Sequence, residues 1–429
     1  MNDIKQSPLS YSQLDILYTD PSITYRHNIP LWFNCNSYIG KLNTIEDVIN
    51  EGSIYVESQS LEMYNKVLQM IEKYEIFRTR IRYVNNKWMQ CVDSNAELIY
   101  NVYNIENEIP ELCKISNSLA IPVLNCVIHS KSQRHVYRLD IHHLFWDGRC
   151  IKLVINEIFH RNKTMLVPLQ YIEWTEFESR HVERIPFTSV ESWYQLDLPY
   201  QHILSLQDLN KAQYYNCKLC TFKIRECSKQ TKTTIYTFIL WITFLMFHSL
   251  TSQSTILVLG ALRNVFFPQF DNMMGLMVKM AFYMAKLDPS HTLIESVMSV
   301  LKMTRKVQQD PHFYYLQHPQ QVQVMLDQTE SLPIFTATNQ TSYTCKYPVH
   351  IYVEKIKQDN STSVYIITPI NGFEEWFSPY LIESIPFWIE EFFTCSSYTV
   401  QNSLERWKQR SSLSFCYLNY RDHQREDDL

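Results

Sequence analysis

Apolar side chains recur at helical spacing in two long stretches of the chain. Within residues 61–73, Leu61, Leu68 and Ile71 fall on one face, and this pattern predicts an amphipathic helix. Residues 235–247 are apolar almost throughout. Because this stretch is shorter than the roughly 20 residues that a bilayer requires, and threonines interrupt it, we predict a buried core helix.

Alternating polar and apolar residues predict strands in the first half. Residues 81–92 form two such runs around the turn pair Asn85-Asn86, and residues 136–141 alternate as a half-buried strand should. Apolar positions over 151–158 then return to helical spacing. Residues 142–148 are therefore a tight connection between a strand and a helix, where α/β proteins commonly place ligand-binding residues.

The second half repeats this order of elements. A polar turn after the apolar helix leads to a strand at 255–260. A further helix is predicted to begin with Ser378 as its N-cap and Pro379 in its first turn, and Pro386 would kink or split it. Strands that alternate with helices in both halves indicate an α/β architecture in two parts.

Length and charge narrow the possible classes. A chain of 429 residues exceeds the size at which one hydrophobic core keeps growing, so two domains or subdomains are expected. The apolar fraction of 45% and the charged fraction of 19% are typical of a folded globular protein. A formal net charge of −5 argues against nucleic acid as a partner, because no basic run offsets it.

Cysteine usage and the first residues predict a cytoplasmic protein without a membrane partner. The eleven cysteines follow no repeating spacing, as expected for reduced thiols. The beginning of the chain has no apolar core of the signal-peptide kind. Cys217 and Cys220, with Cys227 nearby, form a lone CxxC pattern, which is weak evidence for zinc. We expect structural thiols and no metal site.

The segment His142-His143-Leu-Phe-Trp-Asp147-Gly148 carries the most chemical information. A histidine at a strand end can hold a neutral imidazole near pH 7, because its reference pKa is about 6.5. It can then take a proton from an attacking amine or hydroxyl and return it to a leaving thiol. Asp147 could order the loop through a cation or through backbone N–H groups. Gly148 would let the backbone turn without steric cost.

An isolated pair of histidines is more often structural than catalytic. The complete pattern HHxxxDG, however, resembles the signature of nonribosomal peptide synthetase condensation domains and of the wider superfamily that includes chloramphenicol acetyltransferase. The resemblance extends over residues 8–395. Further segments are similar to family elements in the same order: residues 10–17 to SxAQxRLW, 73–81 to RHExLRTxF, 171–177 to YxDYAxW, 260–263 to a GRxR-type stretch and 275–278 to GxFVN.

The resemblance implies an α/β fold of two chloramphenicol-acetyltransferase-like subdomains, residues 1–180 with HHxxxDG and residues 181–429. These would form a V-shaped pseudo-dimer with a central tunnel. One mouth would admit a donor acyl group on the phosphopantetheine arm of a carrier protein, and the other would admit the acceptor. The chain itself would bind no cofactor.

The resemblance also implies roles for individual residues. His143 would be catalytic, by orienting or deprotonating the acceptor amine or by stabilising the tetrahedral intermediate, and His142 would support it. The backbone N–H of Gly148 would face the reaction centre as an oxyanion contact. Asp147 would form a structural ion pair with Arg78.

Three more residues are candidates for contact with substrate: Trp146, Gly275 and Lys279. Lys279 stands where the GxFVN element has asparagine. An additional cation at that position would either alter the choice of acceptor or merely reach solvent, and the sequence does not decide between the two.

The function implied is that of a stand-alone amide synthase in nonribosomal peptide biosynthesis, for example of an antibiotic or a siderophore. It would join a carrier-bound acyl or peptidyl thioester to an amine, either free or on a second carrier protein. One alternative is an O- or N-acyltransferase that uses acyl-CoA, which the elements outside HHxxxDG disfavour. The other is a non-catalytic module that recruits carriers, which the intact HHxxxDG and Arg78 disfavour.

Overall fold

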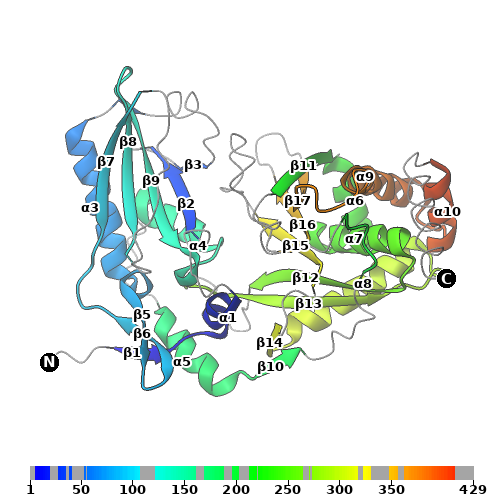
Figure 1. Ribbon diagram of the computed structural model, residues 1–429, viewed down its shortest axis with the longest axis horizontal. Coiled ribbons are helices and arrows are strands. Elements are labelled where there is room, and N and C mark those ends of the chain that lie inside the picture. Colours follow the sequence, from blue (N-terminus) through cyan, green and yellow to red (C-terminus); the bar gives the residue numbers. More distant parts are fainter. Residues whose placement is uncertain are drawn as a thin grey trace.

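Two lobes diverge from a common joint like the arms of a V (Figure 1). The computed structural model describes residues 5–19, 28–34, 38–40, 53–54, 56–106, 121–160, 169–187, 196–201, 212–219, 221–263, 270, 273–316, 322–329, 347–355 and 362–410.

The first lobe is built on a mixed sheet with strand order β3-β2-β9-β8-β7, to which β4 adds along β9. Helix α3 (Glu57–Lys73) lies on the side of this sheet away from the second lobe (Figure 1). Val67 and Ile71 of the helix share a buried cluster with Leu139 of β9. The strands are β2 (Asn28–Phe33), β3 (Tyr38–Gly40), β4 (Ser53–Ile54), β7 (Ile99–Ile105), β8 (Val123–His129) and β9 (Arg134–His142).

Helix α3 confirms the helix predicted over 61–73, but the apolar face predicted for it is buried only in part. Leu61 is 60% exposed, whereas Ile71 is buried together with Met63, Val67 and Met70. Apolar residues occupy more than one stripe of this helix, so periodicity alone did not fix which stripe faces the sheet.

A smaller three-stranded sheet, in the order β1-β6-β5, adjoins the first lobe. It contains the predicted hairpin, since Asn85 and Asn86 have φ angles of 51° and 61°, as a two-residue turn between right-twisted strands requires. Its strands are β1 (Gln6–Pro8), β5 (Thr79–Val84) and β6 (Lys87–Val92), and the 3-10 helix η2 (Glu75–Arg78) leads into β5.

The second lobe is a sheet in the order β11-β17-β16-β15-β12-β13 with helices packed on one side (Figure 1). Its strands are β11 (Ala212–Leu219), β12 (Thr255–Arg263), β13 (Val278–Lys286), β15 (Val324–Thr329), β16 (Val349–Lys355) and β17 (Thr362–Pro369). Its helices are α6 (Thr221–Thr231), α7 (Ile235–Thr251), α8 (Leu293–Gln309), α9 (Phe377–Cys395) and α10 (Val400–Arg410).

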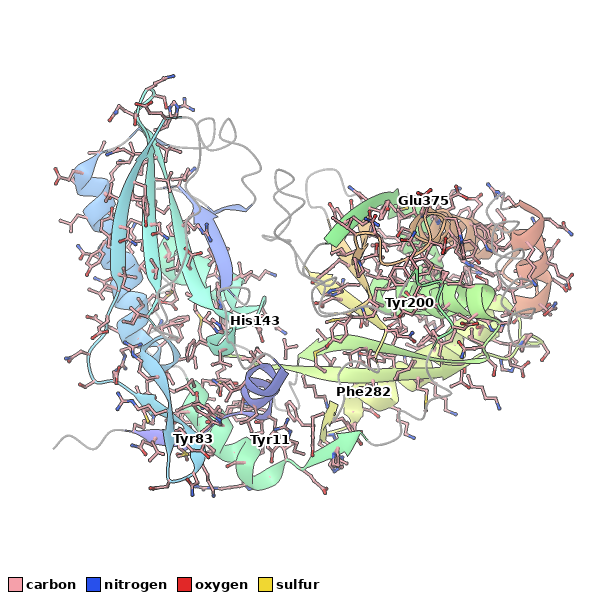
Figure 2. All side chains as sticks on the ribbon, in the orientation of Figure 1. Tyr11, Tyr83, His143, Tyr200, Phe282 and Glu375 are labelled. Carbon is pink, nitrogen blue, oxygen red and sulfur yellow. The ribbon has the colours of Figure 1, made fainter. Side chains whose placement is uncertain are left out.

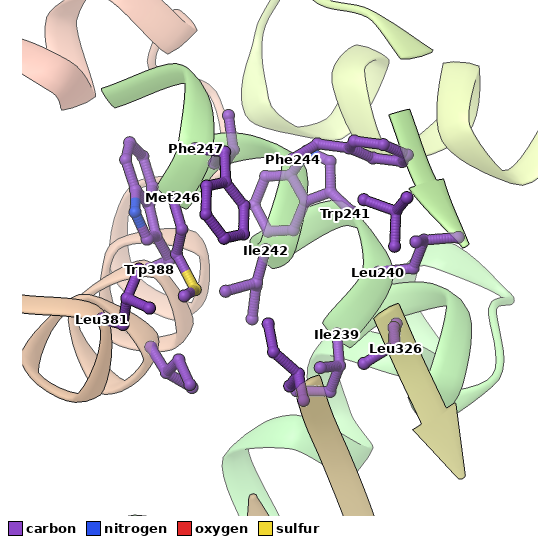
Figure 3. Packing of buried hydrophobic residues seen from close by; sticks show 14 of the residues in the cluster. Ile239, Leu240, Trp241, Ile242, Phe244, Met246, Phe247, Leu326, Leu381 and Trp388 are labelled. Carbon is purple, nitrogen blue, oxygen red and sulfur yellow. The ribbon is translucent and has the colours of Figure 1, made fainter. Parts of the chain in front are cut away.

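Helix α7 forms the centre of the second core, as its apolar sequence predicts. Trp241, Ile242 and Phe244 are fully buried in one cluster with Trp388 of α9 (Figure 3). Among the described helices, none alone is long and apolar enough to cross a bilayer, and only the pair Phe222–Thr231 and Ile235–Thr251, bent by 94°, meets that criterion together.

The predicted start of the late helix is wrong by two residues. Helix α9 begins at Phe377 with Trp376 as N-cap. The hydroxyl of Ser378 lies 3.2 Å from that of Thr368 and so ties the helix to β17 rather than capping it. Pro386 lies inside the helix without ending it.

The joint between the lobes is made by α1 (Tyr11–Thr19), α5 (Tyr171–His181) and the segment that precedes β13. Ser12 of α1 donates a hydrogen bond to the carbonyl oxygen of Val278. The hydroxyl of Tyr171 donates a hydrogen bond to the carbonyl oxygen of Leu276 at 2.7 Å. Strands β10 (Arg184–Phe187) and β14 (Phe313–Leu316) pair in parallel beside them.

The second half of the chain also contributes to the first core. Phe270, Met273, Met274, Leu276 and Met277 belong to the buried cluster of the first lobe. The predicted boundary between residues 180 and 181 falls inside α5, and it does not separate the two cores, because the chain crosses back before β13.

Gly275 lies where the joint is tightest. A Cβ atom at this position would lie 1.9 Å from Cδ2 of Tyr171, whose ring is fully buried and hence unable to move aside. We predict that Gly275→Ala lowers the free energy of unfolding by about 1–3 kcal/mol through overpacking, as measured by chemical denaturation.

Gly148→Ala is the matched control, because a Cβ there would meet nothing within 4 Å. We expect that variant to unfold like the wild type. Equal unfolding of all three proteins would contradict the tight contact at Gly275.

Candidate active site

The HHxxxDG segment turns sharply at the end of β9. The strand ends at His142, a 3-10 turn η3 (His143–Phe145) follows, and helix α4 (Cys150–Ile155) begins after the loop and continues as the π-helical η4 (Asn156–His160). The strand, turn and helix predicted here are thus confirmed.

His142 holds this turn in place. Its Nδ1 accepts a hydrogen bond from the N–H of Leu144 at 3.1 Å, so Nδ1 carries no proton and the ring proton lies on Nε2. The side chain thereby satisfies one of the N–H groups that a turn leaves without a partner. His142 supports the local backbone rather than presenting a base.

His143 has the opposite arrangement. Its Nδ1 lies 2.7 Å from the carbonyl oxygen of Trp146. A carbonyl oxygen can only accept, so Nδ1 carries the proton and, in the neutral ring, Nε2 carries the lone pair. Figure 2 shows His143 on the side of the first lobe that faces the second. A half-buried imidazole in this tautomer can act as a general base.

Gly148 does not serve the purpose that its sequence context suggested. Its backbone is not in the left-handed region, and a Cβ would meet nothing within 4 Å. The turn therefore does not require glycine. What glycine preserves is open space beside the histidine loop, and its oxyanion contact stays a prediction.

Asp147 is buried and accepts hydrogen bonds from the backbone. Its Oδ1 accepts the N–H groups of Arg149 at 3.0 Å and Cys150 at 3.3 Å. Its Oδ2 accepts the N–H of Met277 at 3.1 Å. Because Met277 belongs to the segment that leads into β13, this carboxylate joins the HHxxxDG loop to the second half of the chain.

The predicted ion pair between Asp147 and Arg78 is wrong. The guanidinium of Arg78 donates to the carbonyl oxygens of Asp93 at 2.6 Å, Ser94 at 3.5 Å and Glu72 at 3.4 Å, and no ion pair joins it to Asp147 among the described residues. Of the two partners that the sequence allowed for Asp147, a cation or backbone N–H groups, the structure shows the backbone N–H groups.

Two residues without a role predicted from the sequence complete this contact. The thiol of Cys150 lies 3.3 Å from the carbonyl oxygen of Gly275, and the N–H of Gly275 lies 3.3 Å from the same sulfur. Burial raises the pKa of Tyr171 well above its usual value, so its hydroxyl keeps the proton that it donates to the carbonyl oxygen of Leu276. Tyr171 opens a segment matched to the family, but nothing in its pattern specified this partner, and Cys150 gave no signal.

The opening element of the chain supports the loop from behind. Ser10 and Gln13 form a reciprocal capping box at α1, each side chain bonding the backbone N–H of the other at 3.0 Å. The amide of Gln13 also donates to the carbonyl oxygen of Leu144 at 3.1 Å. The opening element, residues 10–17, and the HHxxxDG segment are therefore in contact.

The three residues predicted to contact substrate lie in the interior. Trp146 is fully buried, and its indole N–H donates to the carbonyl oxygen of Ile141 at 3.1 Å. Gly275 is buried under Tyr171. These positions give both residues packing roles.

Lys279 is also buried, which excludes the expectation that it merely reaches solvent, and its effect on the choice of acceptor stays a prediction. Its ammonium donates to the carbonyl oxygens of Asp310 at 2.6 Å and His312 at 3.0 Å, just after the C-terminus of α8. Burial lowers the pKa of Lys279 to about 8. The ammonium also lies 5.7 Å from the ring centroid of Phe313.

Of the cysteines of the lone CxxC pattern and its neighbour, Cys217 and Cys227 lie among the described residues. Burial raises the pKa of Cys217 to about 11 and that of Cys227 to about 12, as expected for buried structural thiols. Cys220 lies outside the described residues. Within the described ranges, no three His, Cys, Asp or Glu side chains could hold a metal ion together.

Known proteins share both the sequence pattern and the fold. A family model described as Condensation domain matches residues 54–363. Gramicidin S synthase 2 of Brevibacillus brevis is 20% identical over 268 residues, which are 58% of this chain and 6% of that protein. The chain thus spans a small part of the length of such relatives.

Two solved structures show the same fold. The condensation domain of Monacolin K polyketide synthase MokA has a TM-score of 0.68 at 14% identity and covers 92% of this chain and 99% of its own. The starter condensation domain of rhizomide synthetase RzmA in complex with C8-CoA has a TM-score of 0.64 at 7% identity and covers 92% and 97%. The predicted α/β fold of two chloramphenicol-acetyltransferase-like subdomains is confirmed, and the tunnel stays a prediction.

Replacing Asp147 and Arg78 singly and together tests the corrected contacts. We predict that Asp147→Asn lowers the free energy of unfolding by about 2 kcal/mol or more, because an amide keeping its bonds to the loop would turn an N–H toward that of Met277. Arg78→Ala should cost about 1 kcal/mol, and the two losses should add to within about 0.5 kcal/mol. A larger coupling energy between the two sites would restore the ion pair.

Proposed function

Because the chain belongs to the condensation-domain family, we propose that it forms an amide bond between a carrier-bound acyl or peptidyl thioester and an amine. The donor would arrive on the phosphopantetheine arm of a carrier protein. The acceptor would be a free amine or an aminoacyl group on a second carrier. The observation that carries this proposal is the hydrogen bond from Nδ1 of His143 to Trp146, which leaves Nε2 as the basic nitrogen.

The reaction needs little beyond proximity and proton transfer, since a thioester is already activated. The amine nitrogen attacks the thioester carbonyl carbon, the new C–N bond forms, and the C–S bond breaks as the tetrahedral intermediate collapses. Nε2 of His143 takes one proton from the amine and gives it to the departing thiolate. The products are an amide and the thiol of the phosphopantetheine arm, so the atoms balance without a cofactor bound to the chain.

The surroundings of His143 support this assignment. Gly148 lies in the same loop as His143, and the open space beside it would accommodate the reacting carbonyl group. The backbone contacts of Asp147 and the cap provided by His142 hold that loop in one conformation. A fixed base in a fixed loop supplies the orientation on which such a reaction depends.

Acyl-CoA is the second donor to test. The rhizomide synthetase starter condensation domain was solved in complex with C8-CoA, and a CoA thioester carries the same chemical group as a carrier-bound one. An acyltransferase that uses acyl-CoA would need the same base at His143. The two functions therefore differ in donor recognition and not in mechanism.

We predict that wild-type protein forms amide from an octanoyl group loaded on a carrier protein and a pool of primary amines, as detected by mass spectrometry. His143→Ala should reduce the rate at least about 100-fold, because a general base contributes 10²–10⁴. Its melting temperature should stay close to that of the wild type, since the side chain is only half-buried.

Parallel reactions with octanoyl-CoA separate the alternatives. Product from octanoyl-CoA alone would assign the chain to acyl-CoA-dependent transferases. Full activity of His143→Ala with the carrier thioester would refute the role of the histidine. Absence of product from both donors would favour a non-catalytic module that recruits carriers.

A further inference from the structure

Asp327 of the second lobe has no part in the chemistry above. It lies on β15, whose residues Val324 and Leu326 enter the helix-side core. Side chains alternate along a strand, so Met325 and Asp327 belong to the opposite face of the sheet. Figure 1 places β15 on the side of the second lobe that is nearest the first.

The carboxylate of Asp327 has no cationic partner among the described residues. Its Oδ1 accepts the N–H of Gln328 at 2.8 Å, and in the part of the chain that the structure describes no Lys, Arg or His pairs with it. Burial raises the pKa of Asp327 to about 6, so at neutral pH the group is ionised at the expense of folding stability. Such a cost is typical of residues kept for binding.

The neighbours of Asp327 favour an organic cation over a metal ion. Cross-strand register puts Tyr352 of β16 and Tyr365 of β17 level with it on the same face, and both tyrosines are buried. Aromatic rings cannot complete the oxygen shell that a metal ion needs. They can contact an ammonium group through their faces.

The position of Asp327 relates it to the catalytic loop through the sheet. Strands β12 and β15 pair at Leu259–Met325 and Gly260–Leu326, which makes Asp327 level with Ala261 and hence with its partner Met280. Met280 is three residues beyond Met277, which bonds Asp147. At about 3.3 Å per residue and about 4.8 Å between strands, Asp327 lies roughly 15 Å from that contact.

We propose that Asp327 binds a second, distal ammonium group of the acceptor, so that this chain prefers diamines and other amines with a remote positive charge. One end of such an acceptor would present its neutral amine to Nε2 of His143. The other end would pair with the carboxylate, with the ring of Tyr352 beside it on the neighbouring strand. The inference rests on the proposed amide synthesis and specifies the class of acceptor.

Calorimetric titration of the intact chain with acceptors that differ only at the distal end tests this binding site. The probes are 1,8-diaminooctane, 8-aminooctan-1-ol and 8-aminooctanoate. We expect the diamine to bind at least about tenfold more tightly than the amino alcohol, a difference of about 1.4 kcal/mol, and the carboxylate to bind most weakly. Asp327→Asn should remove this order and, by relieving a buried charge, raise the melting temperature at pH 7.

Asp288→Asn is the control, because Asp288 is a carboxylate of the same lobe that already has Ser290 and His291 as partners. It should leave the order of affinities unchanged. Asp327→Lys should invert the order and favour the amino carboxylate. Equal affinities in the wild type, no binding of any probe, or a preference that survives Asp327→Asn would each overturn the proposal.

The same probes separate this inference from the proposed function. Amide formed equally well from the diamine and the amino alcohol would retain the amide synthase and overturn the role of Asp327. Binding of the diamine that depends on Asp327, with no amide formed from either donor, would retain the cation site and overturn the synthase.

Discussion

A buried carboxylate that bonds backbone on both sides of the joint governs the arrangement of this protein. Asp147 accepts N–H groups from its own loop and from Met277 of the returning segment. An ionised group away from water is tolerated only when several donors satisfy it. Both parts of the chain must therefore adopt one relative position, and that position is also the one that places His143.

The remaining contacts at the joint also hold the two parts of the chain together. Cys150 bonds both the N–H and the carbonyl oxygen of Gly275, and Tyr171 lies so close to Gly275 that no side chain fits there. The first core takes in the methionines of the returning segment. A joint fixed in this way would suit the proposed reaction between two separate substrates, because holding two reactants in the right geometry lowers the barrier of such a reaction.

Sequence reasoning predicted well whatever depends on local pattern. The strand, turn and helix around HHxxxDG, the hairpin at Asn85 and the buried helix α7 follow from hydrophobic period and turn chemistry. The predictions were wrong where a side chain could bond several partners of similar chemistry. Arg78 and Asp147 are opposite charges in matched motifs, yet Arg78 bonds backbone carbonyl oxygens and Asp147 bonds backbone N–H groups. No pattern of residues specifies a choice among backbone partners.

Burial was the other property that the sequence did not provide. Trp146, Gly275 and Lys279 lie in segments that match family motifs, which suggested contact with substrate, but each is buried. Conversely, Asp327 lies in a stretch without any motif, and its environment became visible only through the register of four strands. Proximity in a motif does not determine the direction of a side chain, because that depends on the packing of distant elements.

The proposed reaction requires that the fold fix His143 in the tautomer whose Nε2 can accept a proton. Nitrogen NMR of protein labelled with ¹⁵N-histidine, with the signals of His143 identified by their loss in His143→Gln, measures this directly. The structure predicts a protonated Nδ1 and an unprotonated Nε2 at neutral pH. A signal showing the proton on Nε2 and a bare Nδ1 would contradict this requirement, because Nε2 would then be unable to accept the proton of the amine.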